Sequence, residues 1–263
     1  MTAAAALRHA AGVAARGLLA WARDPLAWAL AGLLALAAGM PRLEPLFAAV
    51  FPALDRPMYA QDSFLALLGA HLALVVASSA VALLLGVSAG WFVTRPAGAE
   101  FRPLVEAVVA IGQAVPPVAV LAVAAPLIGF GAWPALIALA LYGLLPILRA
   151  TIAGIESVPP AVLDAATGLG LTGWQRALQA EWPLALPVLL AGVRLSVAVN
   201  IGTAAIASTV GARTLGSPIL IGLAGFNTAY VLQGALLVGA LALVVDSGFA
   251  RLGRRLQRWR EPG

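Results

Sequence analysis

The sequence has no cysteine and no lysine, and charged residues fill only 10% of its 263 positions. Without cysteine, the chain has neither a disulfide framework nor a thiolate metal site. Soluble domains carry about 25% charged residues, whereas this chain is 62% hydrophobic and has a mean hydropathy of +0.98. A water-facing globule of this length cannot bury so much apolar surface. The sequence therefore predicts an integral membrane protein.

The positive charge comes from arginine alone and gives a net charge of +5. The arginines lie at the ends of apolar runs and are not clustered on one soluble face, which argues against nucleic-acid binding. The two histidines, His9 and His71, are far apart and have no evident ligand partners. The sequence also lacks a phosphate-binding GxxxxGK[ST] motif and a catalytic constellation. We therefore expect no enzyme activity, no metal and no cofactor in this chain itself.

The N-terminal region combines a basic, alanine-rich segment over residues 1–24 with the apolar run Leu26–Met40. This run is shorter than the roughly 20 residues that cross a bilayer. It fits either a retained span or the core of a signal peptide, and the long basic lead favours the retained span. The segment Pro41–Asp62 contains four prolines and is predicted to be an external loop.

Five further apolar runs complete an all-α, polytopic fold of about six transmembrane helices. They are Ser63–Val93, Leu104–Ile128, Trp133–Leu148, Leu184–Val210 and Ala229–Phe249. With both termini in the cytoplasm, twelve arginines fall inside and three outside, as the positive-inside rule expects. We expect three regions: an N-terminal segment, span and loop over residues 1–62, a transmembrane domain over 63–250, and a basic tail over 251–263.

The stretch Ser157–Pro187 is the longest part of the last two thirds of the chain that is too polar for lipid. A pair of prolines suits the first turn of a helix, and Gly168 and Gly170 are suited to end it. Thr172 and Gln175 then form a capping box for a second helix. We expect two short helices in a fixed elbow, ended by a proline, that docks onto a partner in the aqueous phase.

This elbow also carries a family resemblance. Asp164-Ala165-Ala166, followed by Gly170 and Pro183, resembles the EAA loop of ABC importer permeases, written E-A-A, three residues, G, nine residues, I-x-L-P. The spacing agrees throughout. The differences are Asp164 for Glu, Ala180 for Ile and Trp182 for Leu.

The resemblance implies a type I importer fold, with a five-helix core and one extra N-terminal helix, in the bacterial inner membrane. Its implied partners are the bilayer, a second permease subunit, an external solute-binding protein and a cytoplasmic ATP-binding subunit that hydrolyses ATP. The elbow would couple to that ATP-binding subunit through Asp164, Ala165, Ala166, Gly168, Gly170 and Pro183. An ordinary cytoplasmic helical hairpin is the alternative.

Polar groups within the spans are candidates for the translocation path. Gln113 precedes Pro116-Pro117, and a double proline predicts a kink at membrane depth. Asn200 and Thr203 lie on a second span. The residues of each span could either line the translocation path or pack against a neighbouring helix. Arg194 should face protein or water, and Asp246 is expected to pair with an arginine of the tail.

The segment from Asn200 to Gly216 extends the resemblance. Its NIGTA and V-G-A-x-x-L-G motifs look like those of the compatible-solute branch, which imports glycine betaine, choline, carnitine and similar compounds. A permease for another small solute, such as an amino acid or a sulfonate, is the alternative. An ion-coupled carrier would need a buried acid pair, which is not evident in the sequence, and a membrane scaffold would not need the elbow's spacing.

Overall fold

The computed structural model describes residues 24–257, which form helices and no strand. The elements are α2 (Pro25–Gly39), η1 (Met40–Leu43), α3 (Glu44–Val50), α4 (Phe64–Val93), η2 (Ala99–Phe101), α5 (Arg102–Ala114), α6 (Pro117–Ile128), α7 (Ala132–Glu156), α8 (Pro160–Gly168), α9 (Gly173–Arg176), a π-helical turn (Ala177–Glu181), α10 (Trp182–Thr203), η4 (Ala204–Val210), α11 (Gly216–Ala224) and α12 (Thr228–Gln257).

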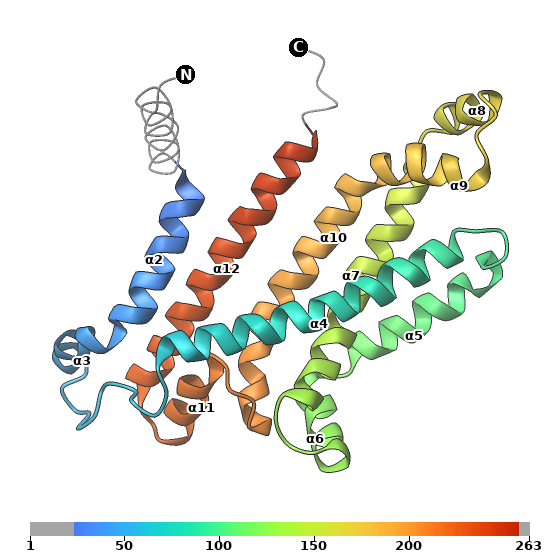
Figure 1. Ribbon diagram of the computed structural model, residues 1–263. Helices are drawn as coiled ribbons and strands as arrows, with labels where there is room; N and C mark the ends of the chain where they lie inside the picture. Colours follow the sequence, from blue (N-terminus) through green and yellow to red (C-terminus); the bar gives the residue numbers. More distant parts are fainter. Residues whose placement is uncertain (1–23, 258–263) are drawn as a thin grey trace, which may run out of the picture.

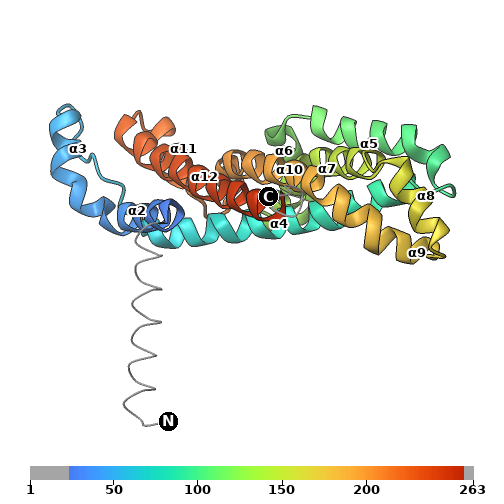
Figure 2. The same ribbon diagram turned by 90° about the horizontal axis from the view of Figure 1, so that it is seen from above.

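The helices form an elongated row. In the view from above, the helices follow one another in the order α2, α12, α10, α7 and α5, and α4 runs along one side of the row (Figure 2). Helices α8 and α9 lie at the same end as the start of α2 and the close of α12 (Figure 1). We call this the elbow end. Helices α3, α6 and α11 lie at the opposite end, which we call the loop end.

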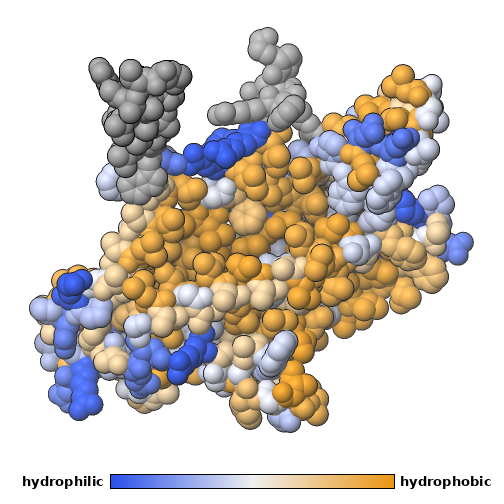
Figure 3. Space-filling model, viewed as in Figure 1, coloured by the Kyte–Doolittle hydropathy of each residue, from blue (hydrophilic) through white to orange (hydrophobic). Residues whose placement is uncertain are grey.

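The described residues include five helices long and apolar enough to cross a membrane. A sixth span results if the broken pair Ala99–Ala114 and Pro117–Ile128 is counted as one. Apolar surface covers the middle of the molecule, whereas polar surface gathers towards the two ends (Figure 3). The fold is therefore the all-α, multi-pass membrane protein that the composition predicts.

Glycines allow α4 and α7 to pack closely. A Cβ on Gly86 would lie 2.9 Å from Cγ2 of Ile147, and one on Gly90 would lie 2.7 Å from Cβ of Thr151. Small residues at helix contacts are typical of membrane proteins, because lipid gives apolar helices no hydrophobic reason to associate and close packing must hold them together. This contact holds α4 against α7 along one side of the row.

The expected external loop from Pro41 to Asp62 is partly wrong. The chain stays helical as far as Val50, and Pro25–Val50 as a whole qualifies as a span. Pro41 and Pro45 lie in the first turns of η1 and α3, where a missing backbone N–H costs no hydrogen bond. The prolines therefore begin new helical turns here. The basic segment before Asp24 lies outside the described residues.

Candidate functional site

The elbow contains the turn that its sequence predicts. Helix α8 ends at Gly168, and Gly170 follows with φ +77°. A side chain at Gly170 would meet no atom within 4 Å, so the glycine is required by the backbone conformation. Thr172 accepts from the backbone N–H of Gln175, and the Gln175 side chain bonds back to the backbone N–H of Thr172. The capping box is confirmed.

The elbow presents an apolar surface with one exposed acid, Asp164. Asp164, Ala165, Gly168 and Gly170 are exposed, whereas Ala166 is buried. The apolar side chains of Leu169, Trp174 and Leu178 are 82%, 64% and 50% exposed. All belong to a segment that projects from the end of the helical row (Figure 1), which is suitable geometry for docking a partner.

The expected end of the second elbow helix at Pro183 is wrong. The π-helical turn Ala177–Glu181 continues α9 directly into α10, where Pro183 occupies the first turn. A π turn inserts one extra residue and so redirects the side chains that follow it. Any movement of the elbow is therefore passed to a continuous helical segment.

A buried acid fixes this segment to the close of α4. The carboxylate of Glu181, only 4% exposed, accepts from Arg95 Nη2 at 2.6 Å and from Arg176 Nε at 3.3 Å. The Arg95 guanidinium also lies 3.8 Å above the Trp91 ring, and Trp91 stacks on Trp182 at 5.0 Å. We call these five residues the Glu181 anchor. The Arg95–Glu181 ion pair and the Trp91–Trp182 stack join the end of α4 to the elbow segment, while the cation–π contact orients Arg95 and the second ion pair lies within that segment.

Three of the predicted path residues, Gln113, Pro116 and Pro117, lie at or beside the break between α5 and α6. Helices α5 and α6 are bent by 89° across this break, so the kink predicted from the double proline is confirmed. The Gln113 amide donates to the carbonyl of Tyr142 at 3.3 Å, and the Tyr142 hydroxyl donates to the carbonyl of Val115. One tyrosine of α7 therefore satisfies a backbone acceptor that the break exposes.

Asn200 is fully buried on the other side of α7. Its Nδ2 donates to Ser79 at 3.2 Å, and its Oδ1 has no hydrogen-bond partner among the described residues. A Cβ on Gly143 would lie 3.0 Å from Asn200 Nδ2, so the contact requires glycine there. Gln113 and Asn200 thus approach neighbouring residues of α7. Thr203 is the last residue of α10. This burial favours the packing interpretation of Asn200 in the single chain.

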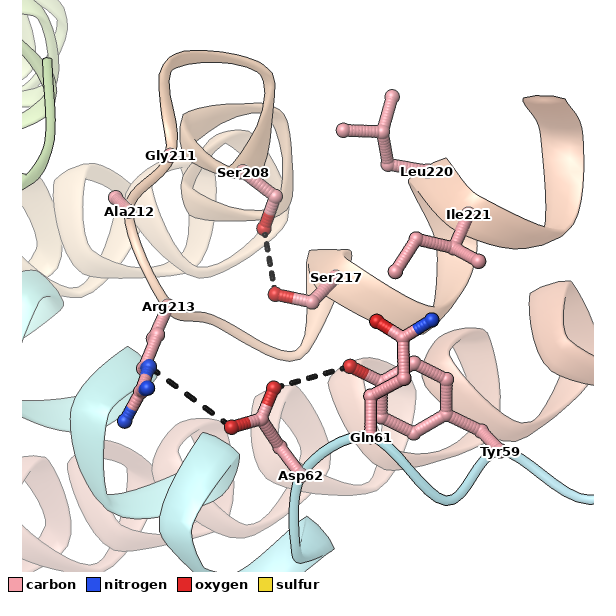
Figure 4. Close-up of a pocket in the computed structure, with 10 residues that line it drawn as sticks. All are labelled: Tyr59, Gln61, Asp62, Ser208, Gly211, Ala212, Arg213, Ser217, Leu220 and Ile221. Atoms are coloured by element: carbon pink, nitrogen blue, oxygen red, sulfur yellow. Dashed lines mark hydrogen bonds and ion pairs between the residues drawn. The ribbon is translucent and has the colours of Figure 1, made fainter.

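The loop end contains a cavity of about 150 Å³ (Figure 4). Tyr59, Gln61 and Asp62 line one side. The other side is lined by Ser208 of η4, Arg213 of the following loop and Ser217 of the first turn of α11. The Tyr59 hydroxyl donates to Asp62 at 3.1 Å, and Arg213 lies 3.8 Å from the same carboxylate. Burial, reinforced by the hydrogen bond to Asp62, raises the pKa of Tyr59 to about 12.

A polar clamp holds the segment before α4 onto α12. Gln233, fully buried, accepts from the backbone N–H of Tyr59 at 3.1 Å and donates to the carbonyl of Pro57 at 2.6 Å. Asn227 donates to the carbonyl of Arg56 at 2.8 Å. Two amide side chains therefore fix a segment 171 to 176 residues distant in sequence.

Comparison with known proteins identifies the family. Residues 82–258, more than half of the chain, match the family described as "Binding-protein-dependent transport system inner membrane component". The chain belongs to this family of permeases.

Two relatives and one solved structure show how far the similarity extends. The permease is 43% identical over 186 residues to the osmoprotectant import permease OsmY of Salmonella typhimurium, covering 71% of this chain and 79% of that protein. It is 38% identical over 191 residues to the glycine betaine/carnitine/choline permease OpuCB of Bacillus subtilis, covering 72% and 86%. A chain of the inward-facing MetNI methionine transporter, at 23% identity, has a TM-score of 0.66 and covers 75% and 99%. This last likeness shows the fold alone.

One predicted ion pair in the permease is wrong. Asp246 pairs with Arg194 of α10, through Nε at 2.6 Å and Nη2 at 2.7 Å. The tail residue Arg251 pairs instead with Asp24 at the start of α2, and this hydrogen bond lowers the pKa of Asp24. Both pairs join α12 to a neighbouring helix in the row.

No sequence pattern singled out the Glu181 anchor or His71. His71 is fully buried, with Nε2 3.0 Å from the carbonyl of Ile201 and Nδ1 accepting from the backbone N–H of Leu215. It therefore links α4 to α10 and to the start of α11. The available signal was a lone histidine in an apolar run, since such a buried polar group needs hydrogen-bond partners. Its partners come from distant backbone and leave no motif.

Proposed function

We propose that this permease imports a compatible solute such as glycine betaine, choline or carnitine, driven by ATP that a separate subunit hydrolyses. The observation that carries the solute class is the 43% identity over 186 residues to a permease named for osmoprotectant import. A second relative of 38% identity is named for glycine betaine, carnitine and choline. The NIGTA and V-G-A-x-x-L-G segments, through Gly216, agree with this assignment.

In this proposal the elbow end faces the cytoplasm and the loop end faces outward. The charge distribution supports that orientation, because Arg95, Arg102, Arg149 and Arg176 all lie on segments that end or turn at the elbow end. The exposed surface around Asp164 and Gly170 receives the ATP-binding subunit. A second permease subunit completes the path, and a solute-binding protein delivers the substrate to the loop end.

The Glu181 anchor provides a connection through which a displacement of the elbow can reach the membrane-spanning helices. Closure of the ATP-binding subunits displaces the elbow, and the continuous segment from α9 to α10 carries the displacement into the row. Because Glu181 also binds Arg95, the end of α4 moves with it. Two helices of the permease core then move as one body relative to the rest, which is the rigid-body rearrangement that alternating access requires.

Uptake by the reconstituted transporter tests the function. Proteoliposomes containing the permease, its ATP-binding subunit and its solute-binding protein should accumulate labelled glycine betaine, choline or carnitine. Accumulation should require ATP on the elbow side and should stop when the solute-binding protein is omitted. Uptake without ATP, driven by a proton or sodium gradient, would instead indicate a secondary transporter.

A further inference from the structure

The turn between α11 and α12 places a large aromatic residue in a backbone conformation suited to glycine. Phe226 has φ +53° and is the one non-glycine residue between 24 and 257 with a positive φ. The N–H of Asn227 bonds to the carbonyl of Gly222 at 2.8 Å, which is the long hydrogen bond of a Schellman helix end. Phe226 occupies the left-handed position of that motif, where glycine is usual, although Gly225 is its neighbour in the chain.

The surroundings hold this turn in place. A Cβ on Gly222 would lie 2.7 Å from the carbonyl oxygen of Asn227, so α11 and α12 are in close contact. The Asn227 side chain donates to the carbonyl of Arg56 at 2.8 Å and accepts from the backbone N–H of Tyr230 at 3.2 Å. The strained conformation is therefore imposed from three sides, and strain that the structure enforces is typical of functional positions.

No packing contact of the Phe226 side chain offsets this strain among the described residues. The Phe226 side chain is 91% exposed, and Leu223, one helical turn earlier, is 63% exposed. The Phe226 ring therefore contributes little to the packing of the fold. A residue that costs stability and buries so little is explained when a partner covers it.

The setting indicates a soluble partner. Asp55 and Arg56, next to the Asn227 contact, are exposed, so the turn lies among charges. Aromatic residues that anchor proteins at the membrane surface are mainly Trp and Tyr, whose polar groups reach the headgroups, and Phe226 has no such group. An exposed apolar ring with charged neighbours matches the common anatomy of a protein interface, which has an apolar centre and a polar rim.

We propose that Phe226 is an apolar anchor for the external solute-binding protein, presented by the α11–α12 turn at the loop end. This inference rests on the importer function and orientation proposed above. Docking inserts the ring into an apolar pocket of the partner, and the exposed side chains of Asp55 and Arg56 face its polar rim. The hydrogen bonds of Asn227 fix the backbone of this turn before the partner binds, so that little conformational freedom is lost on binding.

The test measures solute-binding-protein stimulation of ATP hydrolysis by the full transporter in nanodiscs. Phe226→Gly removes the ring and relieves the strain, and Phe226→Asn removes the ring while tolerating the left-handed backbone. Both variants should keep or raise the thermal unfolding temperature. The concentration of solute-binding protein for half-maximal stimulation should rise about tenfold or more, as expected when an interface anchor is truncated. Phe226→Trp should stay near the wild-type value.

Phe130→Ala is the matched control, because Phe130 is also exposed, at 76%, but has no positive φ. It should leave the half-maximal concentration unchanged. An unchanged value for Phe226→Gly, or equal losses for Phe226→Gly and Phe130→Ala, would overturn the anchor while leaving the importer function intact. Failure of the solute-binding protein to stimulate the wild-type transporter would overturn the importer assignment and the anchor with it.

Discussion

The two ends of the permease are held together by different chemistry. At the elbow end, the buried carboxylate of Glu181 binds two arginines, and a tryptophan stack beside it joins α4 to α10. At the loop end, the neutral amides of Gln233 and Asn227 bind the backbone of the segment before α4. The elbow end is thus held by contacts between the side chains of different helices, whereas at the loop end side chains hold the backbone of a single segment.

Strain is distributed unequally as well. The elbow turn uses a glycine, Gly170, for its left-handed residue, while the loop end uses Phe226 in the same region of backbone space. A non-glycine residue there costs about 1–2 kcal/mol. The elbow turn therefore adopts its left-handed conformation without strain, whereas the loop end stores strain at Phe226, where we propose that a partner docks.

Removing the acid of the Glu181 anchor should have the largest effect. Glu181→Leu leaves Arg95 and Arg176 without their shared carboxylate. Breaking a buried pair costs about 3–5 kcal/mol, and the partial exposure of both arginines, 25% and 34%, reduces this to roughly 2 kcal/mol. ATP-driven uptake should fall further than retention of the ATP-binding subunit, because the elbow surface is intact while its link to α4 is lost.

The control for that variant is Glu106→Gln, which removes an acid from an i,i+4 pair with Arg102 at the same end. This carboxylate is 35% exposed, and exposed pairs contribute only about 0–1 kcal/mol. Uptake should stay near the wild-type level. If Glu181→Leu behaved like Glu106→Gln in both uptake and thermal unfolding, the anchor would not carry the coupling.

Breaking the clamp at the loop end should have an intermediate effect on stability. Gln233→Leu leaves the N–H of Tyr59 and the carbonyl of Pro57 without partners, which costs roughly 1–3 kcal/mol for a buried group. Thermal unfolding should shift downward, with retention of the ATP-binding subunit unchanged. Gln61→Leu, on an exposed glutamine of the same loop, is the control and should lie within about 0.5 kcal/mol of wild type. Equal unfolding temperatures for the two variants would contradict the clamp.

The smallest effect is expected between the two ends, at the helix break. Tyr142→Phe removes the hydroxyl that donates to Val115 and should cost about 1 kcal/mol. A loss of uptake much larger than the loss of stability would show that the break takes part in gating. Thermal unfolding and uptake, measured on the same preparation, separate the two outcomes.

Features that depend on neighbouring residues can be predicted from the sequence, whereas contacts between distant residues cannot. The capping box of Thr172 and Gln175 and the kink at Pro116-Pro117 depend on neighbouring residues, and both were predicted correctly. Arg95, which binds Glu181, and Arg194, which binds Asp246, lie 86 and 52 residues from these acids in the sequence, and any of several arginines was an equally plausible choice. Pro41 and Pro183 were misjudged because a proline interrupts a helix or begins one according to the turn in which it lies.

The central claim is that the elbow docks the ATP-binding subunit, and co-purification of that subunit tests it most directly. Asp164→Lys reverses an exposed charge on the elbow, and Gly170→Val forces a branched residue into the left-handed region. Glu100→Lys reverses another exposed charge at the same end but outside the elbow. At equal membrane abundance, the first two variants should lose at least about tenfold in retention, equivalent to about 1.4 kcal/mol, and Glu100→Lys should retain the subunit. Wild-type retention by Asp164→Lys and Gly170→Val would contradict the account.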